Sequence, residues 1–223
     1  MRIILLIILL SFSFSNGWAQ GLPMEGTDLG SDAVFDDRAM INGYTDKFSE
    51  QSQDVLLSMI ADDSIGPYRC AAAVRVFKQK YAKEILSAQR AGVVKIFLRR
   101  LNHTDSPFVQ VELLNALIVF DRYQYFGSMM PTLIQKLDHY NAVVRDLAYS
   151  DIQEIIKDDQ RTREARIVFN TLRKILFLSR NRLNNVDKPD VKLRQKISIL
   201  RWAITVLGTS ELKRLPPEVI RLL

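Results

Sequence analysis

The feature that most constrains the fold is a pair of short amphipathic segments in residues 131–155, PTLIQKLDHYNAVVRDLAYSDIQEI. Apolar residues recur in each segment at helical spacing, and a polar turn separates the two segments. These apolar residues are Leu133 and Leu137 in the first segment, and Val144, Leu147, Ala148 and Ile152 in the second. Neither helix could bury its apolar face alone, so the pair must pack on neighbouring helices.

A polar pattern links this pair to an earlier part of the chain. Asp138 closes the first helix, and Arg145 follows seven residues later inside the second helix. Asp62 and Arg69 are also seven residues apart, and they lie 76 residues earlier. That offset equals two repeats of 38 residues, so it predicts an array of similar helix pairs.

The same stretch resembles the helix-pair consensus of HEAT repeats. The matching residues are Pro131, Leu133, Leu137, Asp138, Val144, Arg145 and Ala148, and a weaker match covers residues 57–72. The resemblance implies an all-α fold, an α-solenoid of about four HEAT-like antiparallel helix pairs. In the family the second helices usually line a concave binding face, which here would use the helices that begin near Arg69, Val109, Val143 and Lys192. Because the repeats are degenerate, an irregular helical bundle stays open as the alternative.

Four helix pairs account for most of residues 45–223, the expected repeat domain. The expected helices are 46–61 with 67–83, 87–101 with 107–121, the two helices of 131–155, and 160–182 with 190–207. Pro67 suits the first turn of a helix, where its missing N–H costs nothing. The polar pattern is interrupted in the second pair, where Asn102 and Gln110 replace the Asp and the Arg. We expect the Pro216-Pro217 step to end the last long helix and a short turn to follow it.

Composition is consistent with a packed helical protein. The chain has 223 residues and is 48% hydrophobic, which is enough to bury a sizeable core. Its single cysteine, Cys70, can form no intramolecular disulfide, so packing must supply the stability. Cys70 stands beside three alanines in an expected helix, and a small buried thiol is the preferred interpretation over a nucleophile.

The amino-terminal region predicts export from the cytoplasm. Arg2 precedes a short apolar run, and Gly17-Trp18-Ala19 places small residues before a cleavage site, so residues 1–19 are typical of a secretory signal peptide cleaved after Ala19. An uncleaved membrane anchor is the alternative. Residues 20–44 form an expected acidic, flexible leader, with a short helix over 32–43. We therefore expect a periplasmic or secreted protein.

Charge is divided unevenly along the chain. Residues 20–65 hold ten acidic and two basic residues, whereas residues 66–223 hold 28 basic and 15 acidic ones. Residues 157–201 alone carry 13 Lys or Arg and five acids. Arginines recur there at helical spacing along one face of each of two expected helices, at Arg163, Arg166, Arg173 and Arg180, and then at Arg194 and Arg201. Such rows can be ordinary solvated faces, or they can bind carboxylate or phosphate groups in pairs of hydrogen bonds.

The sequence predicts no catalytic, cofactor or metal site. His103 and His139 hold equivalent turn positions in successive pairs, about 10 Å apart if the pairs stack, which is too far for one metal ion. Acid pairs occur at Asp36-Asp37, Asp62-Asp63 and Asp158-Asp159, each beside an expected helix end, where Asp accepts backbone N–H groups. An enzyme with an unrecognised site stays as a minor alternative.

These observations favour a non-catalytic protein-interaction scaffold or adaptor in the cell envelope. The expected partner is another protein, and an acidic one suits the arginine rows. The alternative is binding of an anionic glycan or a lipid head group through the basic face of residues 157–201. The export signal argues against nucleic acid, and the acidic leader could mediate self-association.

Overall fold

The computed structural model describes residues 37–120, 124–157, 160–183 and 188–223, and all regular elements in these ranges are helices. They are α1 (Asp37–Phe48), α2 (Gln53–Ala61), α3 (Pro67–Lys80), α4 (Ser87–His103), α5 (Pro107–Leu117), α6 (Phe126–Lys136), α7 (Ala142–Ile156), α8 (Thr162–Leu183), α9 (Val191–Leu207), the 3₁₀ helix η2 (Thr209–Arg214) and α10 (Pro217–Ile220). The all-α prediction is therefore confirmed. The expected signal peptide and most of the leader lie outside the described residues.

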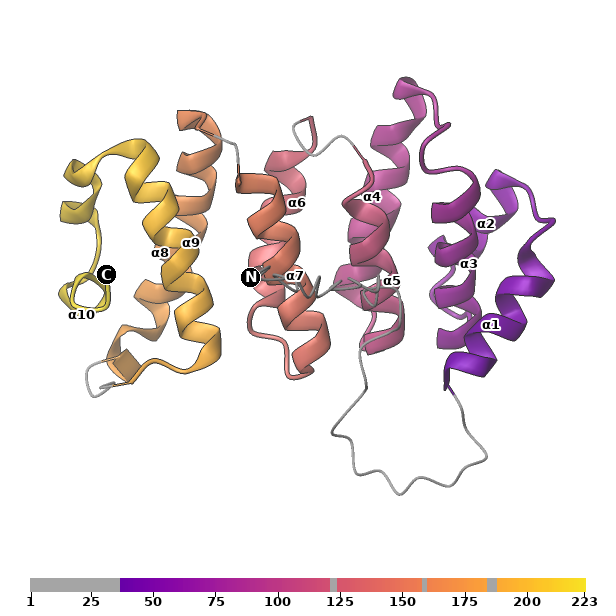
Figure 1. Ribbon diagram of the computed structural model, residues 1–223, viewed down its shortest axis with the longest axis horizontal. Coiled ribbons are helices and arrows are strands. Elements are labelled where there is room, and N and C mark those ends of the chain that lie inside the picture. Colours follow the sequence, from indigo (N-terminus) through magenta and orange to yellow (C-terminus); the bar gives the residue numbers. More distant parts are fainter. Residues whose placement is uncertain (1–36, 121–123, 158–159, 184–187) are drawn as a thin grey trace, which may run out of the picture. The chain divides into compact units, whose positions relative to one another are not determined.

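The helices of the unit Ala33–Leu223 pack in two rows (Figure 1). In one row α1 contacts α3, α3 contacts α5, and α5 contacts α7. In the other row α2 contacts α4, α4 contacts α6, and α6 contacts α8. Contacts between α2 and α3, α4 and α5, α6 and α7, and α8 and α9 join the rows, so each consecutive pair packs on the pair before it.

Hydrogen bonds and ion pairs among the first three helix pairs, α2–α3, α4–α5 and α6–α7, recur at a nearly constant sequence separation. Arg100 pairs with Asp63, 37 residues away, and Arg75 pairs with Glu112, also 37 residues away. The Lys136 ammonium donates to the backbone oxygen of Leu101, which is 35 residues away, at 2.8 Å. Because the separation repeats along the chain, equivalent positions of successive pairs lie against one another.

Short-range signals fix where several helices begin. Pro67 and Pro107 stand in the first turns of α3 and α5, as expected for Pro67. The Asn141 side chain accepts from the N–H groups of Val143 and Val144, and Asp190 accepts from Leu193 N–H at 2.7 Å. Each side chain satisfies backbone donors that the first helical turn leaves unpaired.

Three expected boundaries are wrong. Residues 46–61 form no single helix, because α1 ends at Phe48 and α2 starts at Gln53, after a polar turn in which the Ser49 hydroxyl donates to the Asp46 carbonyl at 2.7 Å. Helix α6 begins at Phe126, so Pro131 lies inside it instead of at its start. Helix α9 ends at Leu207, as the expected range 190–207 has it, but Gly208 with its φ of 97° ends it and the later Pro216-Pro217 step does not.

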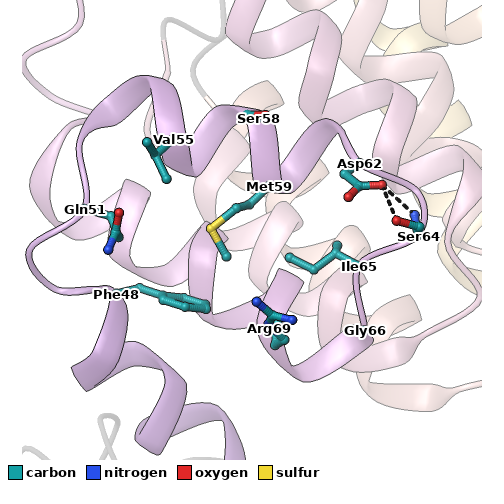
Figure 2. A pocket seen from close by; sticks show the side chains of 10 residues that line it. All are labelled: Phe48, Gln51, Val55, Ser58, Met59, Asp62, Ser64, Ile65, Gly66 and Arg69. Carbon is teal, nitrogen blue, oxygen red and sulfur yellow. Dashed lines mark hydrogen bonds between the residues drawn. The ribbon is translucent and has the colours of Figure 1, made fainter.

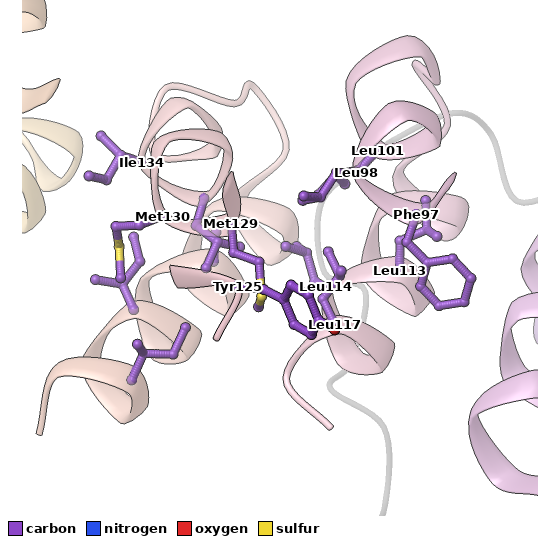
Figure 3. Packing of buried hydrophobic residues seen from close by; sticks show 14 of the residues in the cluster. Phe97, Leu98, Leu101, Leu113, Leu114, Leu117, Tyr125, Met129, Met130 and Ile134 are labelled. Atoms are coloured by element: carbon purple, nitrogen blue, oxygen red, sulfur yellow. The ribbon is translucent and has the colours of Figure 1, made fainter. Parts of the chain in front are cut away.

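The core runs continuously between the two rows. Figure 3 shows its central part, where buried aliphatic and aromatic side chains of α4, α5 and α6 meet. Phe97 is fully buried, and its ring lies edge-on to Phe77 at 5.3 Å between centroids and to Phe120 at 5.8 Å. This cluster joins side chains of two consecutive pairs, because Phe77 belongs to α3, Phe97 belongs to α4 and Phe120 directly follows α5.

None of the helices in the described part of the chain is both long and apolar enough to cross a membrane. The longest of them, α8, is amphipathic and carries six Lys or Arg.

Candidate interaction surfaces

The first row of predicted arginines lies along α8. Arg163 and Arg166 are exposed, whereas Arg173 and Arg180 are half-buried. Arg166 pairs at 3.3 Å with Glu211 of η2, which Arg214 also contacts at 2.7 Å. The hydrogen bond from Arg214 and the nearby Arg166 hold the pKa of the Glu211 carboxyl below its usual range. Arg166 of this row therefore links α8 to η2.

The second row lies along α9. Arg194 and Arg201 are exposed, and the Arg201 guanidinium donates to the Leu222 carbonyl at 3.2 Å. Helices α8 and α9 pack against each other. Each row also contacts the segment that follows α9, the first through Arg166 and Glu211 and the second through Arg201 and the Leu222 carbonyl.

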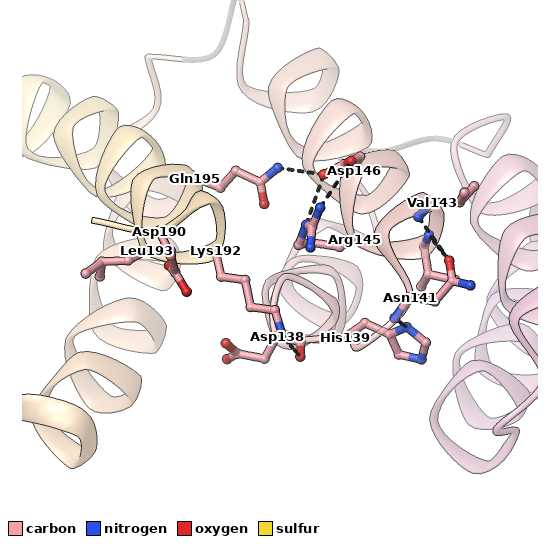
Figure 4. A network of polar contacts seen from close by, with 11 residues as sticks. Asp138, His139, Asn141, Val143, Arg145, Asp146, Asp190, Lys192, Leu193 and Gln195 are labelled. Carbon is pink, nitrogen blue, oxygen red and sulfur yellow. Dashed lines mark hydrogen bonds and ion pairs between the residues drawn. The ribbon is translucent and has the colours of Figure 1, made fainter. Parts of the chain in front are cut away.

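A network of polar contacts joins α9 to α7 and to the turn before it (Figure 4). Lys196 pairs with the Asp138 carboxylate, and Lys192 donates to the Asp138 carbonyl at 3.1 Å. The Gln195 amide donates to Asp146 at 3.0 Å. Because Lys196 is buried on α9, its pairing fixes the register between the third and fourth helix pairs.

A hollow of about 550 Å³ opens beside this network. Its lining combines one indole with hydroxyl, amide and charged groups of α7, the turn after it and α9. The lining residues are Ser150, Gln153, Glu154, Ile156, Lys157, Ser198 and Trp202. The Tyr149 hydroxyl donates to Ser198 Oγ at 3.2 Å and accepts from the Gln153 amide at 3.0 Å, so the lining is held in place by hydrogen bonds. No sequence pattern predicts this hollow, because its lining residues come from two helices that lie about 50 residues apart along the chain.

The first copy of the repeated Asp–Arg pattern lies at a second hollow, of about 460 Å³ (Figure 2). Asp62 closes α2 and accepts from the Ser64 N–H at 2.8 Å and from the Ser64 hydroxyl at 2.7 Å. These hydrogen bonds hold the pKa of Asp62 below its usual range. Arg69 is exposed and lines the same hollow, with Phe48, Val55 and Met59 from α1 and α2.

In the second copy of the repeated Asp–Arg pattern, the two residues make different contacts. Asp138 pairs with Lys196 of α9, whereas Arg145 pairs with its neighbour Asp146 at 3.0 Å. Both residues thus serve contacts at the α7–α9 junction. The equivalent position in the first copy, Asp62, instead caps its own turn.

The two histidines lie near the ends of first helices, but only His139 lies in a turn, as the sequence predicts for both. His103 ends α4 and is exposed. His139 follows α6, accepts from the Asn141 N–H through Nδ1 at 3.1 Å, and lies against the Tyr140 ring at 4.4 Å between centroids. Partial burial lowers the pKa of His139.

The remaining candidates for chemistry have structural contacts. Asp37 accepts from the Tyr68 hydroxyl, and Asp63 pairs with both Arg99 and Arg100, while Asp36, Asp158 and Asp159 lie outside the described residues. Cys70 is fully buried in α3, and burial raises the pKa of its thiol, as for an unreactive cysteine. Among the described residues, no three His, Cys, Asp or Glu side chains gather as metal ligands would.

One buried ionisable group, the Asp151 carboxyl, was not among the residues that the sequence singled out. Asp151 lies on the buried side of α7, is 7% exposed, and its Oδ2 has no hydrogen-bond partner among the described residues. Burial raises the pKa of Asp151 to about 7. An acidic residue on the apolar stripe of α7, one position before Ile152, is the sequence signal that could have indicated a buried carboxyl group.

Comparisons of the chain with protein-family models, with curated proteins and with solved structures found no match. The resemblance to HEAT repeats therefore stays a prediction that depends on the residues alone.

Proposed function

We propose that this protein is a non-catalytic interaction scaffold built as a HEAT-like α-solenoid. Two observations support the architecture: consecutive helix pairs pack on one another in two rows, and contacts among the first three pairs recur at 35 to 37 residues. That recurrence agrees with the repeat of 38 residues in the sequence pattern. Arrays of this kind present long surfaces made of equivalent helices, which suit binding of extended partners.

The binding surface in this proposal is the face of the second helices around α7 and α9. The observation that carries it is the hollow between these helices, with the Trp202 indole among hydroxyl and amide groups. Interface anchors are commonly aromatic side chains with polar neighbours, because the ring buries a large area and the polar groups set orientation. Polar cross-links hold the hollow's walls in register, so a partner would meet a pre-formed surface.

The partner in this proposal is an acidic protein. Arg194 and Arg201 are exposed on the same helix as Ser198 and Trp202. A guanidinium binds a carboxylate through two parallel hydrogen bonds, so the two arginines favour acidic groups beside the hollow. Residues 1–19, as a signal peptide, would place this partner in the periplasm or outside the cell. Amino-terminal sequencing of the exported protein tests that placement, and a mature chain that starts at Gln20 is the expected result.

Crosslinking followed by mass spectrometry in the producing cells tests the scaffold. Lys157 lines the hollow and Lys192 lies on α9, the helix that carries Trp202, so lysine-reactive crosslinkers should join them repeatedly to one acidic protein. The paired variant Arg194→Glu with Arg201→Glu should lose these crosslinks, since it reverses both charges beside the hollow.

A matched variant controls for charge. Lys83→Glu with Lys95→Glu changes the net charge equally at two exposed positions away from α9, and it should keep the crosslinks. If the α9 variant retains the same partner, or if wild-type protein gives only self-links, the proposed surface is wrong.

A further inference from the structure

The outer surface of α8 has one sign of charge. The helix carries six Lys or Arg and a single acid, Glu164, which is buried and pairs with Arg161 at 3.5 Å. Its cations are Arg163, Arg166, Arg173, Lys174, Arg180 and Arg182. In the described part of the chain, the only ion pair formed by these six is that of Arg166 with Glu211. Seen from solvent, α8 is therefore a strip of cations about 33 Å long without a carboxylate of its own.

Two large apolar side chains protrude within this strip. Phe177 is 50% exposed and Leu178 is 75% exposed. The Arg180 guanidinium lies 4.2 Å from the centre of the Phe177 ring and donates to the Phe177 carbonyl at 3.1 Å. An arginine held on a ring in this way keeps its charge while part of its hydration is replaced by the aromatic face. Exposed apolar groups and cations thus occupy the same end of the helix.

We propose that α8 is a docking surface for an anionic lipid bilayer. The head groups supply negative charge spread over a plane, which suits cations spaced along one helix, and the acyl boundary just beneath can receive Phe177 and Leu178. The arginine and lysine stems can remain in the apolar layer while their charged ends reach the phosphates. An acidic protein could also satisfy the charges, but Phe177 and Leu178 protrude from the helix and line neither hollow, which suits insertion into a bilayer better than a fitted protein contact.

This surface is separate from the one proposed for the protein partner. The α8 strip and the arginines Arg194 and Arg201 belong to different helices, and the cations of α8 line neither of the two hollows described above. The scaffold could therefore hold a protein through α7 and α9 while α8 rests on a membrane. Loss of one activity would leave the other in place, so the two proposals fail independently.

A fluorescent label reports directly whether this end of α8 enters a bilayer. Cys70 is fully buried, so a thiol-reactive NBD dye will label an introduced cysteine selectively. We would label the full chain as Leu178→Cys and, as a control, as Leu86→Cys, which is 67% exposed before α4. With vesicles of phosphatidylglycerol and phosphatidylcholine, the label at 178 should shift to the blue and be quenched by doxyl lipids. The label at 86 should do neither, and phosphatidylcholine alone should affect neither position.

Charge reversal tests the electrostatic half of the proposal. Arg173→Glu with Lys174→Glu should weaken cosedimentation with the anionic vesicles by about tenfold or more. Lys83→Glu with Lys95→Glu changes the net charge equally and should have little effect. Added salt should weaken wild-type binding, as it screens exposed charges.

Several outcomes would overturn the proposal. One is absence of binding to anionic vesicles, and another is binding that leaves the label at 178 in water, which would assign membrane contact to a different part of the chain. Equal binding by the two charge variants would also refute it. A label at 178 that responds to an acidic protein but not to vesicles would assign α8 to protein binding instead.

Discussion

At the scale of residues, two buried ionisable side chains stand out because neither is fully satisfied. Arg100 is 7% exposed and pairs with Asp63 at 2.7 Å, yet its Nε has no hydrogen-bond partner among the described residues. Asp151 is equally buried and has a carboxylate oxygen without a partner. Buried charge without full compensation costs stability, so both positions should respond strongly to substitution or pH.

Asp151 should make the protein less stable as the pH rises. Its pKa is about 7 in the folded chain against an ordinary value of 3.8, so between these values the folded state holds a proton that the unfolded state has released. The free energy of unfolding is therefore unaffected by Asp151 titration below pH 3.8, and it falls between pH 3.8 and pH 7. Above pH 7 it is constant again, and the total decrease is about 4 kcal/mol. Asp151→Asn should abolish this dependence and be the more stable protein at pH 8.

Urea denaturation of both proteins at pH 5 and pH 8 measures the effect. The difference between the two unfolding free energies isolates Asp151, because other titrating groups are common to both. A difference that does not change with pH would show that Asp151 is ionised in the folded state.

The Arg100–Asp63 pair should show strong coupling. Asp63→Ala leaves the buried guanidinium without its carboxylate, so it should lower the free energy of unfolding. Adding Arg100→Met removes the unpaired charge and should recover most of that loss. A double-mutant cycle with the three variants measures the coupling, and strictly additive effects would contradict it.

At the scale of elements, the start of α7 depends on one side chain. Asn141 accepts from two backbone N–H groups, so Asn141→Ala should cost about 1 kcal/mol of unfolding free energy. Ser52 precedes α2 at the same kind of position but makes no capping hydrogen bond through its side chain. Ser52→Ala is therefore the matched control and should change stability by less than about 0.5 kcal/mol. Equal losses in the two variants, measured by thermal or urea denaturation, would exclude a specific role for the Asn141 side chain.

At the scale of the whole molecule, the aromatic cluster around Phe97 connects the α2–α3 pair to the α4–α5 pair. Phe97→Ala should lower the free energy of unfolding by about 3 to 5 kcal/mol, because it opens a cavity where two rings pack edge-on. Each pair contacts chiefly its neighbours, so hydrogen exchange should increase in α3 and α5 more than in α9. Uniform loss of protection across all helices would show instead that the unit opens only as a whole.

The sequence by itself determined the helical class and most helix positions. Apolar residues at helical spacing, with prolines such as Pro67 and polar turns between segments, are local signals, and they placed the helices from α3 to α9 nearly as the structure has them. Boundaries failed where local signals compete. The pattern of residues 46–61 predicts one continuous helix, although a turn at Ser49 divides it into two helices. Pro131 is tolerated inside α6 because the surrounding apolar residues are buried.

Only the tertiary structure decided which polar groups meet. The arginines of α8 and α9 share one stretch of sequence, yet Arg166 pairs with Glu211 of η2 whereas Arg201 donates to the Leu222 carbonyl. Asp138 finds its partner in Lys196, 58 residues away, and the hollow beside Trp202 is built from helices separated by the whole of α8. Helical periodicity predicts which face of a helix is buried. Which other helix packs on that face depends on how the helices cross and stack, and no local pattern encodes that arrangement.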